Sequence, residues 1–289
     1  MPLVFPSHVR RSLAALAVSV SALGALFSGA FASGCGSSTS ADSTSDGSAE
    51  ADGSPLEGGN DAGVDTGTDA KVDGGAPRFC GTLVPAPRFC DDFEDGDLEN
   101  DWDVVTKFGT SEGSLDTTRA RLSAASFHVA APGLATDMDF GNVHLRRTVI
   151  SPAPHLTLSF WAFYPKVTID KGLLAIATVN VTLTHQFVIY LRDDDATTPG
   201  PAFQEIANSI TARHVLTKLP AAGAWTHVEL SLDLDLGTAT LSFDGDKALD
   251  AIPITAETTS EATIRLGAVF ATGPSDAFEA NYDDVVLDF

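Results

Sequence analysis

The stretch that decides the fold reads VELSLDLDL, from Val228 to Leu236. Its apolar and polar residues alternate without a break, which is typical of a β-strand that buries one face. A second run, TATLSF from Thr238 to Phe243, follows closely and is ended by Asp244-Gly245. Because this dipeptide tolerates the positive backbone angles of a tight turn, the sequence predicts a hairpin here.

Strand-like stretches continue on both sides of this hairpin, and very few residues carry helical signals. Besides 225–236 and 238–243, the best examples are residues 142–150, 156–164, 173–179, 185–193, 262–270 and 281–289. Many short strands without intervening helices predict an all-β protein, built as a two-sheet sandwich or a barrel.

Three segments resemble, in chain order, parts of the concanavalin A-like (laminin-G-like) jelly-roll domains. FCDDFEDG at 89–96, followed by Trp102, resembles their opening strand, and the hairpin at 225–245 is similar to their central strand pair. YDDVVL at 282–287 resembles the strand that closes the domain beside the first. The resemblance covers residues 80–289 and implies an antiparallel two-sheet β-sandwich. Because the superfamily includes lectins, glycoside hydrolases, polysaccharide lyases and adhesive modules, the fold leaves the function open.

The chain begins with the layout of an export signal. Residues 1–34 contain no Asp or Glu, and Arg10 and Arg11 precede an uncharged apolar run. Ala32-Ser33-Gly34-Cys35, at the end of this run, resembles the lipobox of bacterial lipoproteins, whose cysteine is acylated. We expect a lipoprotein signal peptide over 1–34 and a lipid anchor at Cys35. The alternatives are a soluble secreted protein and an uncleaved membrane span.

A lipid anchor would hold the protein on a membrane without crossing it, because each buried methylene adds about 0.8 kcal/mol. Gly36 follows the cysteine, where an aspartate would signal retention at the inner membrane. By this family-level rule we expect the outer membrane of a bacterial cell envelope.

Residues 35–79 are rich in Gly, Ser and Asp and contain few large apolar side chains. Such a segment cannot bury enough surface to offset the ordering of its backbone, so it predicts a disordered acidic tether. Cys80 and Cys90 close two copies of the string APRFC. They are the remaining thiols once Cys35 is lipidated, so in an oxidising compartment we expect them to form a disulfide.

The charge of the chain argues against nucleic acid as a partner. The 289 residues include 39 acidic and 17 basic side chains, for a formal net charge of -22. A phosphate-binding surface needs clustered Lys and Arg, and the field of this molecule would repel a polyanion.

Eight acidic residues lie between Asp91 and Asp103. They would face Asp283 and its neighbour if the terminal strands pair. Carboxylates this close repel each other unless a cation lies among them, and several families of this fold hold calcium at this place. The sequence thus suggests a structural calcium ion bound by Asp92 and Asp283, with a solvated acidic loop as the alternative.

The catalytic motifs of this superfamily are missing from the sequence. The string Glu-x-Asp-x-x-Glu of the retaining glucanases is absent, as are the arginine-rich and tyrosine-rich strands of the alginate-lyase relatives. Sugar-binding members place exposed aromatic and polar side chains on one sheet face, and Trp161, Tyr190 and Arg192 are candidates. We therefore expect a monomeric, non-catalytic carbohydrate-binding or adhesive module. The alternatives are a divergent glycoside hydrolase or polysaccharide lyase, and a structural or protein-interaction lipoprotein.

Overall fold

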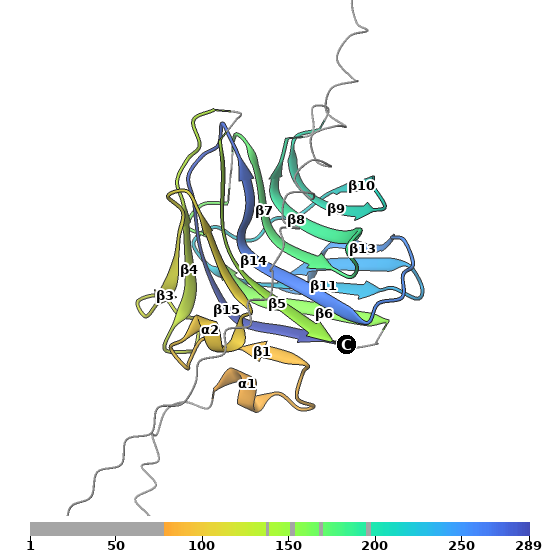
Figure 1. The fold of residues 1–289 in the computed structure, drawn as a ribbon, viewed down its shortest axis with the longest axis horizontal. Coiled ribbons are helices and arrows are strands. Elements are labelled where there is room, and N and C mark those ends of the chain that lie inside the picture. Colours follow the sequence, from red (N-terminus) through yellow and green to blue (C-terminus); the bar gives the residue numbers. More distant parts are fainter. Residues whose placement is uncertain (1–77, 137–138, 151–153, 168–169, 195–197) are drawn as a thin grey trace, which may run out of the picture. The chain divides into compact units, whose positions relative to one another are not determined.

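The computed structural model describes residues 78–136, 139–150, 154–167, 170–194 and 198–289. The predicted signal peptide, Cys35 and nearly all of the predicted tether lie outside these residues. The described chain folds into two antiparallel sheets with two four-residue helices, α1 (Phe79–Thr82) and α2 (Leu98–Asp101) (Figure 1). The predicted all-β sandwich is confirmed. No helix in the described part is long and apolar enough to span a membrane.

Sheet A contains both ends of the described domain. Its strand order is β13-β12-β11-β6-β15-β4-β3, and β1 also pairs with β15. The bounds are β1 (Phe89–Asp91), β3 (Glu112–Asp116), β4 (Ser126–Ala131), β6 (His155–Phe163), β11 (Trp225–Asp233), β12 (Thr238–Phe243), β13 (Asp246–Pro253) and β15 (Phe278–Asp288). The opening and closing strands therefore lie side by side, as the sequence predicted.

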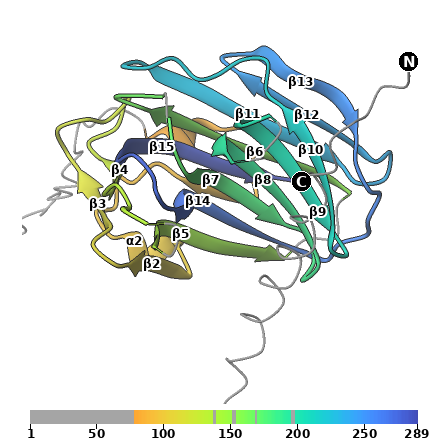
Figure 2. The ribbon, with the colours of Figure 1, turned by 90° about the horizontal axis from the view of Figure 1, so that it is seen from above.

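Sheet B packs against sheet A and has the strand order β10-β9-β8-β7-β14-β5-β2. The bounds are β2 (Val104–Phe108), β5 (Phe140–Ile150), β7 (Leu173–Asn180), β8 (His185–Asp193), β9 (Gly200–Ala207), β10 (Ile210–Val215) and β14 (Glu261–Thr272). The order of the strands in both sheets can be followed in Figure 2.

The core lies between the sheets and follows from strict alternation along the strands. On β6 and β11 every second side chain is buried, and Phe160 and Val228 are opposite each other in the register. Phe187 on β8 enters the same core from sheet B. Each such large apolar side chain contributes about 1.5–3 kcal/mol on burial. The intervening residues necessarily point outward, so each sheet has one outer face on which a site can form.

The central hairpin forms where it was predicted, with one shortened strand. Asp244 and Gly245 both have positive φ angles, 52° and 79°, as the turn requires. The predicted strand 225–236 ends early, at Asp233, although the alternation continues. The carboxylate of Asp233 accepts a hydrogen bond from the backbone N–H of Leu236 at 2.8 Å and closes a turn there.

Cys80 and Cys90 form the predicted disulfide, which joins α1 to β1. The bond closes a short loop at the start of the described domain. On the chain-entropy model a loop of this length contributes about 2.5–3 kcal/mol of stability.

Three neighbouring strands of sheet B carry β-bulges at a similar level. The register shifts around Ala175 on β7, between Tyr190 and Asp193 on β8, and between Leu266 and Phe270 on β14. A bulge bends its strand, and Figure 1 shows β7, β8 and β14 curving along their length. These bends position the hollow described next.

Candidate functional site

A shallow hollow of about 280 Å³ lies on the outer face of sheet B, over the bulges. We call it the sheet B hollow. Its lining residues come from four strands: His144 of β5, Ala175 and Thr178 of β7, Gln186, Val188 and Tyr190 of β8, and Arg265, Val269 and Phe270 of β14. None of these residues is a carboxylate.

The backbone beside the hollow depends on one glycine. Gly267 of β14 has φ +133°, and a Cβ there would lie 2.4 Å from the carbonyl oxygen of Val143 on β5. Glycine therefore lets β14 and β5 approach closely just before the β14 bulge. The bulge then directs Val269 and Phe270 toward the hollow.

The floor of the hollow is apolar. Ala175, Val188, Tyr190 and Val269 form a buried cluster that is separate from the core between the sheets. Phe270 lines the same hollow with 45% of its surface exposed. An apolar floor with an aromatic side chain that reaches solvent is typical of a ligand-binding surface.

Two deeply buried side chains of the hollow have polar atoms without a partner. His144 is 7% exposed and Thr178 is 3% exposed. The Nδ1 atom of His144 and the Oγ1 atom of Thr178 make no hydrogen bond within the described residues, and neither does the Nε atom of Arg146 on β5. An unsatisfied buried polar group costs about 1–3 kcal/mol. The unpaired atoms of His144 and Thr178 belong to side chains that line the same hollow, so both are available to hydrogen-bond a ligand there.

One arginine lines the hollow, Arg265, and a second, Arg146, lies next to it on β5. Arg146 and Arg265 are opposite each other in the β5–β14 register. Arg265 donates a hydrogen bond to the Oδ1 atom of Asn180 at 3.3 Å, and neither arginine forms an ion pair within the described residues. Burial and the nearby Arg146 lower the pKa of Arg265.

The imidazole and the phenol of the hollow are uncharged near neutral pH. Burial, with the charges of Arg265 and Arg146, lowers the pKa of His144 to about 4. Burial, with the charge of Asp193, raises the pKa of Tyr190 to about 12. The hollow therefore offers a neutral imidazole, a phenolic hydroxyl, the amide of Gln186 and the guanidinium of Arg265 around an apolar floor, with Arg146 opposite Arg265 on the neighbouring strand.

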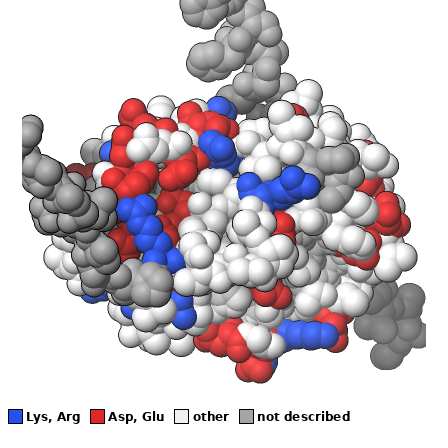
Figure 3. Space-filling model, turned by 90° about the horizontal axis from the view of Figure 1, so that it is seen from below, with Lys and Arg blue, Asp and Glu red and all other residues white. Residues whose placement is uncertain are grey.

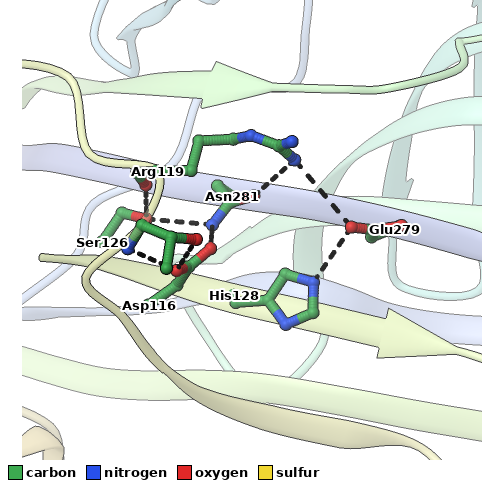
Figure 4. A network of polar contacts seen from close by, with 7 residues as sticks. Asp116, Arg119, Ser126, His128, Glu279 and Asn281 are labelled. Carbon is green, nitrogen blue, oxygen red and sulfur yellow. Dashed lines mark hydrogen bonds and ion pairs between the residues drawn. The ribbon is translucent and has the colours of Figure 1, made fainter.

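The outer face of sheet A is organised differently. Figure 3 shows the side of the molecule opposite to that of Figure 2, where acidic and basic side chains lie next to one another. At one edge of sheet A they form a connected network, made of Asp116, Arg119, Ser126, His128, Glu279 and Asn281 (Figure 4). Asn281 donates to both Asp116 and Ser126 at 3.0 Å. None of the buried side-chain polar atoms of this network lacks a partner.

Arginines also cover the aromatic side chains of sheet A. The guanidinium of Arg121 lies 3.6 Å from the ring centroid of Trp161, and that of Arg119 lies 4.3 Å from the ring centroid of Phe163. Trp161 also contacts His227, with 5.1 Å between the ring centroids. One face of each aromatic ring is therefore taken by a cation of the protein itself.

The predicted binding set of Trp161, Tyr190 and Arg192 is not a single site. Trp161 lies on β6 of sheet A, while Tyr190 and Arg192 lie on β8 of sheet B. Arg192 donates a hydrogen bond to Asp194 at 3.3 Å and does not line the hollow. Periodicity identified outward-facing side chains, but it could not show that the two strands belong to opposite layers. Only Tyr190 belongs to the candidate site.

The predicted calcium ligands are engaged in other contacts. Asp283 accepts hydrogen bonds from the backbone of Arg121 and the hydroxyl of Ser123, both at 2.8 Å. Its neighbour Asp284 pairs with the Arg121 guanidinium at 2.7 Å, and Asp92 accepts from the backbone N–H of Cys80. In the described part, no three or more His, Cys, Asp or Glu side chains are grouped so as to hold a metal ion. Calcium binding by Asp92 and Asp283 stays a prediction, which a chelation experiment tests.

Most of the sheet B hollow was not predictable from the sequence. His144, Arg146, Thr178 and Arg265 form no motif, and Arg146 and Arg265 come from strands far apart in the chain. One feature of the sequence could have indicated the site: Arg146 and Arg265 lie inside predicted strands, although the protein is strongly acidic. Their partner strands could not be assigned without the tertiary structure.

Comparisons with known proteins locate the fold but not a family. No protein-family model matches the chain, and no curated protein matches it. Among solved structures, a protein described as "cellulose induced protein" superposes with a TM-score of 0.51 and 14% identity, over 69% of this chain and 96% of that chain. This likeness supports the jelly-roll sandwich.

Two further solved structures superpose less closely. One is an endo-β-1,4-glucuronan lyase from the fungus Trichoderma reesei, with a TM-score of 0.44, 15% identity and coverage of 70% of this chain and 95% of that chain. The other is a domain of an extracellular arabinanase from Geobacillus stearothermophilus, in complex with arabinotriose, with a TM-score of 0.44, 13% identity and coverage of 69% and 93%.

Proposed function

We propose that this protein binds a glycan in the sheet B hollow, without catalysis, while anchored to a bacterial cell envelope. One observation carries the proposal: unpaired atoms of the buried His144 and Thr178 line the same hollow as the apolar floor and the exposed Phe270. A pyranose ring has apolar faces that pack on such a floor, and its hydroxyls would complete the unpaired groups. The similarity to the cellulose-induced protein is in line with a carbohydrate-related role.

A glycoside hydrolase fits the hollow less well than a binding module. Hydrolysis with either stereochemical outcome ordinarily uses two carboxyl groups on opposite sides of the scissile bond. The lining residues of the hollow include none. Glycan binding, unlike hydrolysis, does not require catalytic carboxyl groups.

A polysaccharide lyase is the second candidate, favoured by the neutral imidazole of His144. Its unpartnered Nδ1 atom lies in a hollow that also contains Tyr190 and Arg265. A lyase requires a base that takes a proton from the sugar and a cation that stabilises the resulting anion. Ultraviolet absorbance of an unsaturated product, formed from a uronic acid polymer and lost in His144→Gln, would establish this activity in place of simple binding.

The anchor is part of the proposal, although its residues lie outside the described structure. Acylation at Cys35 would hold the domain on the outer membrane, and residues 35–79 would serve as the tether of a monomer. Detergent phase partitioning tests this: the full chain should enter the detergent phase, and Cys35→Ala should move it to the aqueous phase. Recovery of both forms in the aqueous phase would contradict lipidation.

Binding is tested with the full chain on a glycan array, followed by titration of the best ligand. Phe270→Ala should weaken binding about tenfold, because an aromatic contact contributes on the order of 1 kcal/mol beyond simple area burial. Phe140→Ala is the matched control. Phe140 lies on the same sheet with 46% exposure, against 45% for Phe270, but packs on Phe108 outside the hollow. Equal losses in both variants would contradict the assignment of the site.

A further inference from the structure

The arginines of the described domain fall into two groups. From residue 119 onward, five of them form ion pairs with carboxylates: Arg119 with Glu279, Arg121 with Asp284, Arg147 with Asp103, Arg192 with Asp194 and Arg213 with Asp193. Arg146 and Arg265 are the two described arginines of this region that form none, and they are register partners beside the hollow. The protein is strongly acidic, with 39 Asp and Glu residues, yet none of those in the described part lines this hollow.

Two adjacent guanidinium groups without a carboxylate partner are unfavourable in a partly buried setting. Each is removed from part of its water, and like charges repel each other. Their mutual influence shows in the lowered pKa of Arg265, for which Arg146 is a cause after burial. The nearby His144 stays neutral and adds no third charge. An anionic ligand would remove this penalty, because a carboxylate accepts paired hydrogen bonds from guanidinium groups.

We propose that the sheet B hollow is selective for acidic glycans, with Arg146 and Arg265 binding the anionic group of the sugar. This inference rests on the proposed glycan-binding function and specifies its ligand class. The apolar floor at Val188 and Tyr190 would contact the sugar ring, and the unpaired Nδ1 of His144 and Oγ1 of Thr178 would meet its hydroxyls.

The overall charge limits the length of the ligand. At a net charge of -22 the field of the protein repels a long polyanion, while the two arginines act only at close range. A short acidic oligosaccharide gains the local contact without most of the repulsion. We therefore expect the preference to be clearest with oligosaccharides and at moderate salt.

The test is a calorimetric titration of the full chain with a galacturonic acid trisaccharide, a neutral galactose trisaccharide and a sulfated galactose trisaccharide. We expect the acidic trisaccharide to bind at least tenfold tighter than the neutral one. Arg146→Gln and Arg265→Gln should each weaken acidic binding about tenfold, as expected for one charged hydrogen-bonding group. Tighter binding of the sulfated sugar, with the same losses, supports the anion site and identifies sulfate as the preferred group.

Arg147→Gln is the matched control, because Arg147 is the next residue on β5 and pairs with Asp103 instead. It removes the same charge and should leave the preference for acidic sugar unchanged. Arg146→Lys and Arg265→Lys keep the charge and should retain part of that preference, which guards against loss through misfolding.

Two results would overturn the inference. If the neutral trisaccharide binds as tightly as the acidic one and the Arg146 and Arg265 variants change nothing, acidic selectivity is wrong, while glycan binding stands. If Arg147→Gln weakens acidic binding as much as the other two variants do, the effect belongs to net charge rather than to the hollow. Absence of binding to every glycan tested would contradict the proposed function itself.

Discussion

The outer faces of the two sheets are built from the same strand periodicity but use their polar residues differently. On sheet A, Arg121 is bound to Asp284 and stacked on Trp161, and the network around Asn281 is complete. On sheet B, the unpaired atoms of the buried His144 and Thr178 belong to side chains that line a hollow; on sheet A the Oδ1 of Asp284 is unpaired as well, but its other oxygen is bound by Arg121. Polar groups that satisfy each other hold a structure together, whereas unpaired ones remain available to a ligand.

The largest expected effect concerns the sheet A side. Arg121→Ala should lower the free energy of unfolding by about 3 kcal/mol, because it leaves the carboxylate of Asp284 buried without its partner. The side chain of Asp284 is fully buried and that of Arg121 is 23% exposed. Chemical denaturation of the full chain measures the loss, and Arg121→Lys should recover part of it. Glycan affinity at a temperature where the variant is folded should not change. If Arg121→Ala lowered glycan affinity as much as the sheet B variants do, the assignment of binding to sheet B and of a structural role to sheet A would be wrong.

The two sides should respond oppositely to pH. His144 has a pKa of about 4 when folded and 6.5 as its reference, so the unfolded chain binds the proton more readily. Stability from this group is present above pH 6.5 and is lost as pH falls through about 4, by up to about 3 kcal/mol.

Burial raises the pKa of Asp91 to about 7 and that of Asp283 to about 6. These groups act in the other direction: their stabilisation is full below pH 3.8 and is lost as pH rises through 6 to 7. Denaturation curves from pH 4 to 7 should show a steeper decline toward high pH in His144→Gln than in the unaltered chain. Parallel pH profiles would show that His144 does not titrate as expected.

The next prediction concerns the glycan affinity of two variants, at Tyr190 and at Trp161, which the sequence had suggested as parts of one binding face. Tyr190→Ala should weaken glycan binding about tenfold, because it removes part of the apolar floor and a hydrogen-bond donor. Trp161→Ala should leave affinity within about twofold while lowering stability, since its ring packs under Arg121. Titration and thermal denaturation of both variants measure the two quantities. A stronger loss of affinity in Trp161→Ala would move the site to sheet A.

The smallest expected effect is a gain of stability. Thr178→Val replaces an unpaired buried hydroxyl by a methyl group of similar size, which should raise the free energy of unfolding by about 1 kcal/mol. The same change should weaken glycan binding, because the hydroxyl no longer meets the ligand. Denaturation and titration of one preparation test both. A destabilised variant would show that Oγ1 has a structural role in the free protein.

The strands with regular alternation were predictable, and the irregular ones were not. β8 and β12 match their predicted bounds. On β12 the apolar residues face one core at every second position, and on β8 the apolar run is buried on both faces, with Val188 and Tyr190 in the cluster under the hollow. β10, with mostly exposed or half-buried residues, and the short β2 and β3 carry no such pattern. Each is held in its sheet by a neighbouring strand: β10 by β9, β2 by β5 and β3 by β4. Periodicity does not record this contribution.

Bulges explain why the site itself could not be predicted. Strict alternation would place Asp283 and Asp284 on opposite faces of β15. A register shift between Asp283 and Val286, with Asp284 at φ 49°, lets both carboxylates contact Arg121. The bulges around Ala175, Tyr190 and Phe270 similarly shape the sheet B hollow.

The sequence by itself determined the fold class, the central hairpin and the cysteine pair of this protein. These depend on local periodicity, on turn residues such as Asp244-Gly245 and on a short chain separation. Only the tertiary structure decided which charges are neutralised and which are not, because the partner of each side chain comes from a distant strand. Arg121 meets Asp284 across 163 positions of the chain, while Arg146 and Arg265 lie opposite each other in the β5–β14 register and form no ion pair with any described carboxylate. This difference cannot be derived from composition or residue spacing, and it distinguishes the outer face of sheet A from the candidate site on sheet B.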